Sequence, residues 1–398
     1  MSRETLAIDG GAPVRDRRLA YGRQLVGEDD IAAVSEVLRS DWLTTGPKVE
    51  EFECAFAEAV GVSHAVAVSS GTAALHATAH AVGISPGDEA IVPALTFAAT
   101  ANCVVFEGGS PVFADVDPST LLIDPRSVEA ALSPRTKAIF SVDYAGQPCD
   151  YTALHEIAGR ADIPVLADAC HALGASAAGR PVGSLALASS FSMHPVKPIT
   201  TGEGGMVTTD NAELAGLARR FRSHGIETDF RQREHDGSWY YEMVDLGFNY
   251  RLNDIQCALG LSQLKKLPAW LDRRREIARR YDEVFTQLDG LAPLGRMPDT
   301  EHAYHIYVVQ LDLERLSCGR QQVFRALQAE GIGVNVHYLP VHLHPYYRER
   351  FGTGPGLCPV AEAAYERILT LPLTHAMTDD DAADVIAAVE KVMAAYAG

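Results

Sequence analysis

Short apolar runs alternate with segments of helical spacing from about residue 64 onward. A run with β-branched residues at 64–68 breaks at a Ser/Gly/Thr turn and continues as the helical sequence AALHATAHAVG. Further apolar runs follow as AIVP, PVFADVD, TKAIFSVDY, IPVLADAC and ALASSFSM. Strands that are apolar throughout and separated by helices are typical of a parallel sheet covered on both faces. The pattern therefore predicts an α/β fold, in which ligands bind beyond the carboxyl ends of the strands.

The character of the chain changes after about residue 260. LSQLKKLPAWLDRRREIARRYDEVFTQL has the spacing of a long amphipathic helix with a proline interruption. Beyond it, YHIYVVQLDL and GIGVNVHYLP predict strands, and RQQVFRALQAEG and residues 379–397 predict helices. We therefore expect an N-terminal arm at 1–29, a large α/β domain at 30–265 and a smaller α+β domain at 266–398.

Charge and cysteine usage exclude several classes of protein. The chain has 34 basic and 52 acidic residues, a net charge of −18, which disfavours binding to nucleic acids and to anionic membrane surfaces. Its seven cysteines are scattered without a CxxC pair, which argues against a disulfide framework and a zinc site. The polar N-terminus resembles no signal peptide, and no uncharged stretch suits a membrane span. We expect a cytoplasmic protein without a metal, and without nucleic-acid or membrane partners.

A turn of small residues, Ser69-Ser70-Gly71-Thr72-Ala73, joins the first apolar run to the first helical segment. Small side chains can be a steric requirement of such a connection. They can also let an anion reach the free N–H groups and the positive dipole end of the helix, with the Thr72 hydroxyl as a further donor. The turn is neither a Walker loop nor GxGxxG.

Candidate functional residues also follow three other expected strands. Asp168 ends IPVLAD and could cap the next turn, bind a metal or orient a ring nitrogen, and His171 could be a loop residue or a ligand donor. Phe97 follows PALT and could pack in the core or form a stacking platform. Lys197 lies in SMHPVKPITTGEGG, among small residues that suit a lysine approached by a cofactor.

One cofactor accounts for this combination. Pyridoxal 5′-phosphate (PLP) needs a lysine for its Schiff base, an acidic residue on its pyridinium nitrogen, an anion site and a flat apolar face. Lys197 supplies the amine, Asp168 the acidic residue, Gly71 with Thr72 the anion site and Phe97 the apolar face. In the sequence all of them follow strands of one predicted sheet.

Ordered sequence blocks identify a family at this point. The chain resembles the sugar aminotransferases of the DegT family, which are fold-type I PLP enzymes. The blocks that carry the resemblance are YGRQ, SDWLTTGPKVEEFE, SSGTAALHA, PALTFAATAN, DYAGQPCD, ADACHALGA, FSMHPVKPITTGEGGMVTT, LGFNYRLNDIQCALGLSQL and VHYLPVHLHPYY. The resemblance implies a large domain with a mostly parallel seven-stranded sheet between helices, and a smaller α+β C-terminal domain.

The resemblance also implies a role for individual residues. Lys197 and Asp168 would be catalytic, as the Schiff-base lysine and the partner of the pyridinium nitrogen. The other cofactor contacts it implies are Gly71, Thr72, Ala73 and Ser192 at the phosphate, His171 at the phenolic oxygen and Phe97 on the ring. Asn249, in FNYR, would reach the phosphate of the neighbouring subunit's cofactor, so that the minimal active unit would be a homodimer with shared sites. Departures from the family pattern at Cys170, Met193 and Pro198 remove no reacting group.

The activity implied is transfer of an amino group from glutamate to the keto carbon of a nucleotide-linked keto sugar. Within the family, YGRQ, SDWLTTGPKVEEFE, DYAGQPCD, WYYEM and PVHLHPYYR are most similar to the branch that makes UDP-4-amino-4,6-dideoxy-N-acetyl-β-L-altrosamine in the pseudaminic acid pathway. A different keto sugar or a keto cyclitol would suit the same residues. Two further functions stay open, a sugar dehydratase, which would carry histidine at the lysine position, and a regulatory homologue without turnover.

Overall fold

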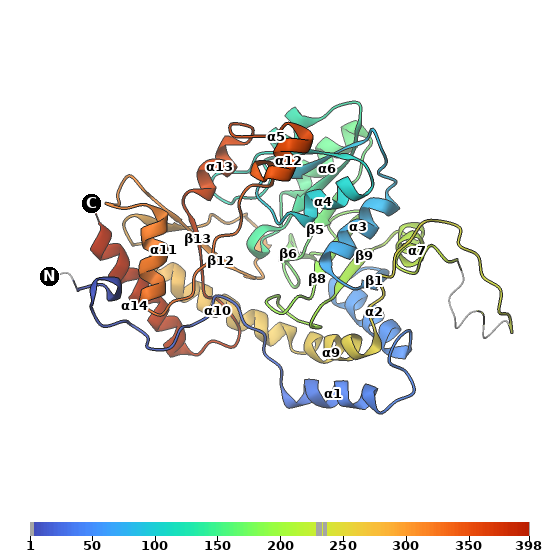
Figure 1. Cartoon of the computed structure of the whole chain (residues 1–398), viewed down its shortest axis with the longest axis horizontal. Helices are drawn as coiled ribbons and strands as arrows, with labels where there is room; N and C mark the ends of the chain where they lie inside the picture. Colours follow the sequence, from blue (N-terminus) through green and yellow to red (C-terminus); the bar gives the residue numbers. More distant parts are fainter. Residues whose placement is uncertain (1–3, 228–232, 234–236, 398) are drawn as a thin grey trace.

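The computed structural model describes residues 4–227, 233 and 237–397, arranged in two lobes (Figure 1). The larger lobe contains a seven-stranded sheet in the order β1-β9-β8-β5-β4-β2-β3, in which only β9 is antiparallel to its neighbours. The strands are β1 (His64–Val68), β2 (Glu89–Pro93), β3 (Ser110–Ala114), β4 (Thr136–Val142), β5 (Val165–Asp168), β8 (Ala188–Ser192) and β9 (Gly205–Thr209). The predicted α/β class with a mostly parallel seven-stranded sheet is confirmed.

Helices cover this sheet and connect its strands. They are α2 (Pro47–Val60), α3 (Gly71–Ala81), α4 (Ala99–Phe106), α5 (Pro125–Ala131), α6 (Tyr151–Ala161), α7 (Ala212–Phe221) and α9 (Asp254–Leu264). Helix α3 packs against β8 and β9 and contacts both α4 and α7. Helix α1 (Glu28–Leu38) lies on the outside of the lobe against α9 (Figure 1).

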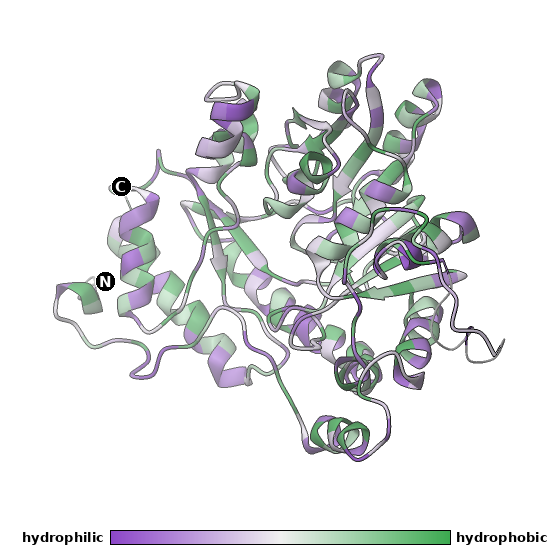
Figure 2. Ribbon diagram, turned by 45° about the vertical axis from the view of Figure 1, so that its right-hand side comes forward, coloured by the Kyte–Doolittle hydropathy of each residue, from purple (hydrophilic) through white to green (hydrophobic). Residues whose placement is uncertain are grey.

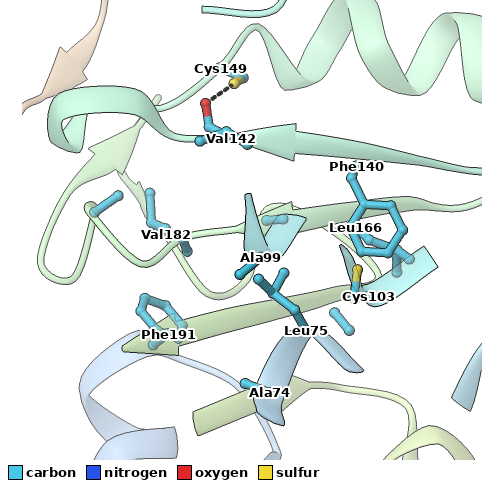
Figure 3. Packing of buried hydrophobic residues seen from close by; sticks show 14 of the residues in the cluster. Ala74, Leu75, Ala99, Cys103, Phe140, Val142, Cys149, Leu166, Val182 and Phe191 are labelled. Atoms are coloured by element: carbon cyan, nitrogen blue, oxygen red, sulfur yellow. Dashed lines mark hydrogen bonds between the residues drawn. The ribbon is translucent and has the colours of Figure 1, made fainter. Parts of the chain in front are cut away.

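The core of the large lobe lies between these helices and the sheet (Figure 3). Leu75 from α3 and Cys103 from α4 belong to one buried cluster with Phe140, Leu166 and Phe191 from the strands. Each large apolar side chain buried in this way contributes roughly 1.5–3 kcal/mol. Since α3 is fixed by this packing, its first turn is held at the carboxyl edge of the sheet.

The smaller lobe has its own core. It contains the antiparallel sheet β10-β12-β13, made of β10 (Leu291–Pro293), β12 (Tyr307–Leu311) and β13 (Ile368–Leu371), together with α10 (Leu267–Phe285), α11 (Arg320–Ala329) and α14 (Asp379–Tyr396). The N-terminal segment with η1 (Ala7–Asp9) packs here, and both ends of the chain lie at this lobe (Figure 1). A third small sheet joins β6 (Ser176–Ala177), β7 (Arg180–Pro181) and β11 (Thr300–Glu301).

The two lobes share elements. Leu271 of α10 belongs to the core of the large lobe, whereas Ile277 of the same helix belongs to the smaller core. Helices α12 (Pro345–Phe351) and α13 (Pro359–Tyr365), preceded by η3 (Val341–Leu343), also contribute to the large core. The predicted domain boundaries at 29/30 and 265/266 therefore stay a prediction.

Two secondary-structure expectations are corrected. GIGVNVHYLP forms no strand, because its residues 332 and 335 make only isolated bridges, to Leu19 and Thr370. The expected long helix is two helices, α9 and α10, and Pro268 lies in the first turn of the second, where a missing N–H costs no hydrogen bond.

Figure 2 shows hydrophilic and hydrophobic residues alternating along the surrounding helices. None of the helices in the described part of the chain could cross a membrane.

Candidate active site

Most of the candidate residues lie at one edge of the large sheet. Strands β1, β2, β5 and β8 are parallel, so their carboxyl ends meet at the same edge. The candidates that follow these ends are Gly71, Thr72 and Ala73 after β1, Phe97 after β2, Asp168 and His171 at and after β5, and Ser192 and Lys197 at and after β8.

The first turn of α3 packs closely against the ends of β5 and β8. A Cβ atom on Gly71 would lie 2.8 Å from Cβ of Ser192 and 3.1 Å from Sγ of Cys170, so a side chain there would collide. Ser70 caps the helix, its Oγ accepting a hydrogen bond from the N–H of Ala73 at 3.1 Å. The steric reason for small residues therefore holds. It is compatible with an anion site, because Thr72 on the same turn stays partly exposed.

Lys197 lies in a tightly hydrogen-bonded loop between β8 and β9. Its own N–H donates to the carbonyl of His194 at 2.9 Å, and the Oγ1 of Thr200 donates to the carbonyl of Met193 at 3.0 Å. Burial lowers the pKa of the Lys197 ammonium, and the negative charge of Asp168 offsets only part of this effect. The loop therefore presents an amine that loses its proton more readily than an exposed lysine does.

The Asp168 carboxylate is buried and held by two donors. Its Oδ2 accepts from the hydroxyl of Thr100 at 2.6 Å, and its Oδ1 accepts from the N–H of Cys170 at 3.2 Å. The second contact is the turn cap that the sequence pattern allows for this residue. Since a carboxylate can accept about four hydrogen bonds, the cap leaves acceptor capacity for a ring N–H.

His171 lies next to Asp168 with one nitrogen bound and one unpartnered. Its Nε2 lies 3.1 Å from the hydroxyl of Tyr338, while no group in the described structure hydrogen-bonds its buried Nδ1. Burial, reinforced by the charge of Lys197, holds the pKa of this imidazole well below its usual range. A neutral ring that accepts from Tyr338 at Nε2 carries its hydrogen on Nδ1, which makes that nitrogen a donor without an acceptor.

Phe97 and Asn249 are placed differently from the buried candidates. The Phe97 ring is exposed, so it is not a core residue, and its centroid lies 5.9 Å from that of Tyr338. Asn249 is also exposed and pairs with Ser223 by a backbone bridge. Asn249 does not cap the following helix, because Asn253 occupies the cap of α9 and accepts from the N–H of Gln256.

The groups at this edge fit PLP in chemical type. An amine of lowered pKa, a fixed carboxylate, an imidazole N–H without an acceptor and a helix start of small residues match its aldehyde carbon, ring nitrogen, phenolic oxygen and phosphate. The described residues contain no group of three His, Cys, Asp or Glu that could hold a metal ion.

Two polar residues at the site were not predicted from the sequence. Thr100 lies within α4 as one threonine in a run of small residues, and only its bond to Asp168 reveals a role. Tyr338 falls in the block VHYLPVHLHPYY, which carries the family resemblance and was the one available signal.

The contact between Thr100 and Asp168 gives a stability prediction. Thr100→Val removes a buried hydroxyl that donates to the Asp168 carboxylate and accepts from the Thr96 hydroxyl, so we expect the free energy of unfolding to fall by about 1.5–3 kcal/mol in urea denaturation. Thr78→Val is the matched control, because its hydroxyl pairs with the neutral Ser190 hydroxyl at 3.1 Å and the loss of that bond should cost about 0.5–1.5 kcal/mol. Equal losses in the two variants would show that Thr100 does not support a charged Asp168.

Comparison with known proteins shows similarity over nearly the whole chain. The model of the DegT/DnrJ/EryC1/StrS aminotransferase family matches residues 24–390. The spore coat polysaccharide biosynthesis protein SpsC of Bacillus subtilis is 45% identical over 381 residues, which is 95% of this chain and 98% of SpsC. The PMP-form of Spr1654 from Streptococcus pneumoniae has a TM-score of 0.89 at 32% identity and covers 95% of this chain and 99% of its own. PseC of Helicobacter pylori, an aminotransferase involved in the biosynthesis of pseudoaminic acid, has a TM-score of 0.89 at 35% identity and covers 96% and 100%.

Proposed function

The chain belongs to the DegT/DnrJ/EryC1/StrS aminotransferase family, and from this premise we propose the substrates and residues of its reaction. The chain is a PLP-dependent sugar aminotransferase of fold type I. We propose that it transfers an amino group from glutamate to C4 of a UDP-linked 4-keto-6-deoxy-N-acetylhexosamine. The observation that carries the proposal is that three sequence blocks typical of that branch lie beside the carboxyl edge of the large sheet, one of them against the loop that contains Lys197.

Three of these blocks meet beside the candidate site. Tyr21, in YGRQ, packs its ring 5.4 Å from the ring of His337, and the adjacent Gly22 approaches Val196, the neighbour of Lys197. Tyr144, in DYAGQPCD, donates its hydroxyl to the carbonyl of His337. The block PVHLHPYYR lies over the end of β2, because its residue 341 donates its N–H to the carbonyl of Ala94 at 2.8 Å.

The proposed roles of the side chains follow from their surroundings. PLP, when bound, supplies an electron sink for the charge that develops at the reacting carbon. We assign to Lys197 Nζ the removal of the α-proton of glutamate and, in the second half of the reaction, the delivery of a proton to C4 of the sugar. Asp168 holds a proton on the ring nitrogen of PLP, His171 donates from Nδ1 to its phenolic oxygen, and Thr72, Ala73 and Ser192 bind its phosphate.

A panel of keto substrates tests the proposed sugar. The enzyme would be incubated with glutamate and, separately, with UDP- and TDP-linked 4-keto sugars, a 3-keto sugar nucleotide and a keto cyclitol, with amination read by mass spectrometry. We expect the highest kcat/KM with the UDP-linked 4-keto-6-deoxy-N-acetylhexosamine. Preference for a TDP-linked sugar or a cyclitol would overturn the substrate proposal while leaving the aminotransferase assignment intact.

We further propose a homodimer in which Asn249 serves the partner's cofactor phosphate. Apolar side chains around Asn249 are unusually exposed for a single chain, with Leu246 at 70% and Met243 at 64%. Among the described residues none hydrogen-bonds to the Asn249 side chain, so its amide is available to a partner. A second copy of the chain that packs on these residues would bury the apolar surface. It would also bring its own cofactor phosphate to the Asn249 amide.

Complementation between two variants with different lesions tests the shared site. Lys197→Ala and Asn249→Ala chains would be mixed and refolded together. A heterodimer then has one site with both lesions and one with neither, so random pairing should restore about one quarter of wild-type activity in a two-fold symmetric dimer.

The matched control mixes Lys197→Ala with Asp168→Asn. Both of these residues belong to the site of their own chain, so every site in the mixture keeps one lesion and no activity should return. If the Asn249 mixture behaves like this control, with heterodimers verified by two affinity tags, Asn249 does not serve the partner.

A further inference from the structure

Two histidines on consecutive turns of α3 share a single carboxylate. Glu107 follows the end of α4, and its Oε1 lies 2.9 Å from Nε2 of His76. Its Oε2 lies 3.3 Å from Nδ1 of His80. All three side chains are largely buried, and none of them contacts the candidate cofactor residues. The proposed reaction gives this cluster no role.

The same histidines fasten a distant segment to α3. The remaining nitrogen of His80, Nε2, lies 2.9 Å from Oδ2 of Asp245. The remaining nitrogen of His76, Nδ1, lies 3.1 Å from the hydroxyl of Tyr250. Residues 245–250 are therefore held at both ends, and Asn249 lies between the two attachment points.

The contacts of His80 indicate the charge of its ring. Both nitrogens of His80 face carboxylate oxygens, which only accept hydrogen bonds, so both nitrogens must carry hydrogen and the ring is an imidazolium. His76 faces one carboxylate and one hydroxyl, so only one of its nitrogens lies opposite a group that can do nothing but accept. His80 is therefore the member of the cluster whose charge is essential.

The other neighbours of His80 do not compete for its proton. Helix α7 presents the ring of Phe221, stacked on the His80 ring at 4.1 Å. Within the described residues, the charged groups that face His80 are Glu107 and Asp245, and the titratable groups near them are His76 and Tyr250. The hydrogen bond to Glu107 raises the pKa of His80. Although burial opposes it, hydrogen bonding to His76 and His80 lowers the pKa of Glu107 to about 2.

We propose that His80 is a positioning residue that clamps the 245–250 segment to α3 and so fixes Asn249 in the orientation that the partner's cofactor phosphate requires. The proposal rests on the proposed function in one respect, the shared role of Asn249. It makes the retention of PLP depend on the charge of His80, which lies further along α3 than the turn at the phosphate site. The clamp is complete while His80 is protonated and Glu107 ionised.

The clamp should therefore weaken as the pH rises. Since the folded-state pKa of His80 is raised, its contribution is full below the ordinary value of 6.5 and is lost as the pH passes the higher folded value. On the acid side it is full above the ordinary value of 4.5 for Glu107 and is lost only as the pH falls towards about 2. The wild-type protein should then release PLP faster on the alkaline side, in excess of any change in the variant that lacks the imidazole.

The test is a double-variant cycle on PLP release. The rate of PLP loss from the holoenzyme would be followed by absorbance in the wild type, His80→Gln, Asn249→Ala and the double variant. We expect His80→Gln to release PLP about tenfold faster, the typical effect of losing a charge-assisted hydrogen bond, and to lose the alkaline pH dependence. The double variant should release PLP no faster than Asn249→Ala alone, because His80 acts through Asn249.

The outcomes separate the clamp from the shared site. Additive effects of the two substitutions, or an unchanged pH dependence in His80→Gln, would overturn the clamp while leaving Asn249 in place. No effect of Asn249→Ala on PLP release would overturn both the shared site and the clamp. Asp245→Asn provides a second variant at a partly exposed position that should fold normally and release PLP faster than wild type. Its control, Asp272→Asn, removes the carboxylate of a surface pair with Arg275 and should change nothing.

Discussion

Lys197→Ala should abolish amino transfer while leaving the fold intact. In the proposed mechanism the Lys197 amine bonds to PLP and moves the substrate proton, and alanine can do neither. We expect kcat to fall on the order of 10⁴-fold or more, the upper end of the range for loss of a general acid–base group. The absorption band of lysine-bound PLP should disappear, while the melting temperature of the apoprotein should stay within a few degrees of wild type.

The control for this substitution is Lys137→Ala. Lys137 is exposed near the start of β4, away from the carboxyl edge of the sheet, so kcat and the absorption band should be unchanged. Appreciable turnover by Lys197→Ala would exclude Lys197 as the reacting amine.

Asp168→Asn should have the second largest effect. Asparagine has nearly the same shape and can still accept from Thr100, but it carries no charge to keep the ring nitrogen of PLP protonated. We expect a loss of kcat on the order of 10²–10⁴-fold with PLP still bound.

Asp143→Asn is the matched control for a buried carboxylate. Asp143 follows the neighbouring strand β4 and is held by Cys149 and Tyr151, and burial raises its pKa to about 7. Its substitution should lower the free energy of unfolding and leave kcat close to that of the wild type. A normal kcat for Asp168→Asn would mean that the carboxylate serves only as the cap of the turn after β5.

The strands and the order of the candidate residues could be predicted because local sequence determines them. The run IPVLAD is apolar and ends in one acidic residue, and β5 ends at that residue, Asp168. GIGVNVHYLP shows the limit of this reasoning. It has the alternation of a strand. However, the N–H groups of Gly331 and Gly333 donate to the carbonyls of Gln328 and Leu19, not to those of a neighbouring strand.

The supporting residues of the site could not be predicted because their partners are distant in sequence. Thr100 and Asp168 are 68 residues apart, and His171 and Tyr338 are 167 apart. A threonine in α4 gains a role only when the fold brings a carboxylate to its hydroxyl. The same holds for His80 and Asp245, which are 165 residues apart and have no shared motif.

Chemical trapping of PLP on the chain tests the proposed site and its chemistry together. Borohydride makes the bond between PLP and a lysine amine permanent, and peptide mapping by mass spectrometry then locates the labelled lysine. We expect the label on the peptide that contains Lys197, and we expect prior incubation with glutamate to prevent labelling and to release one 2-oxoglutarate per chain. A label on any other lysine, or labelling that glutamate and other amino donors leave unchanged, would contradict the assignment of Lys197 as the residue that carries amino transfer.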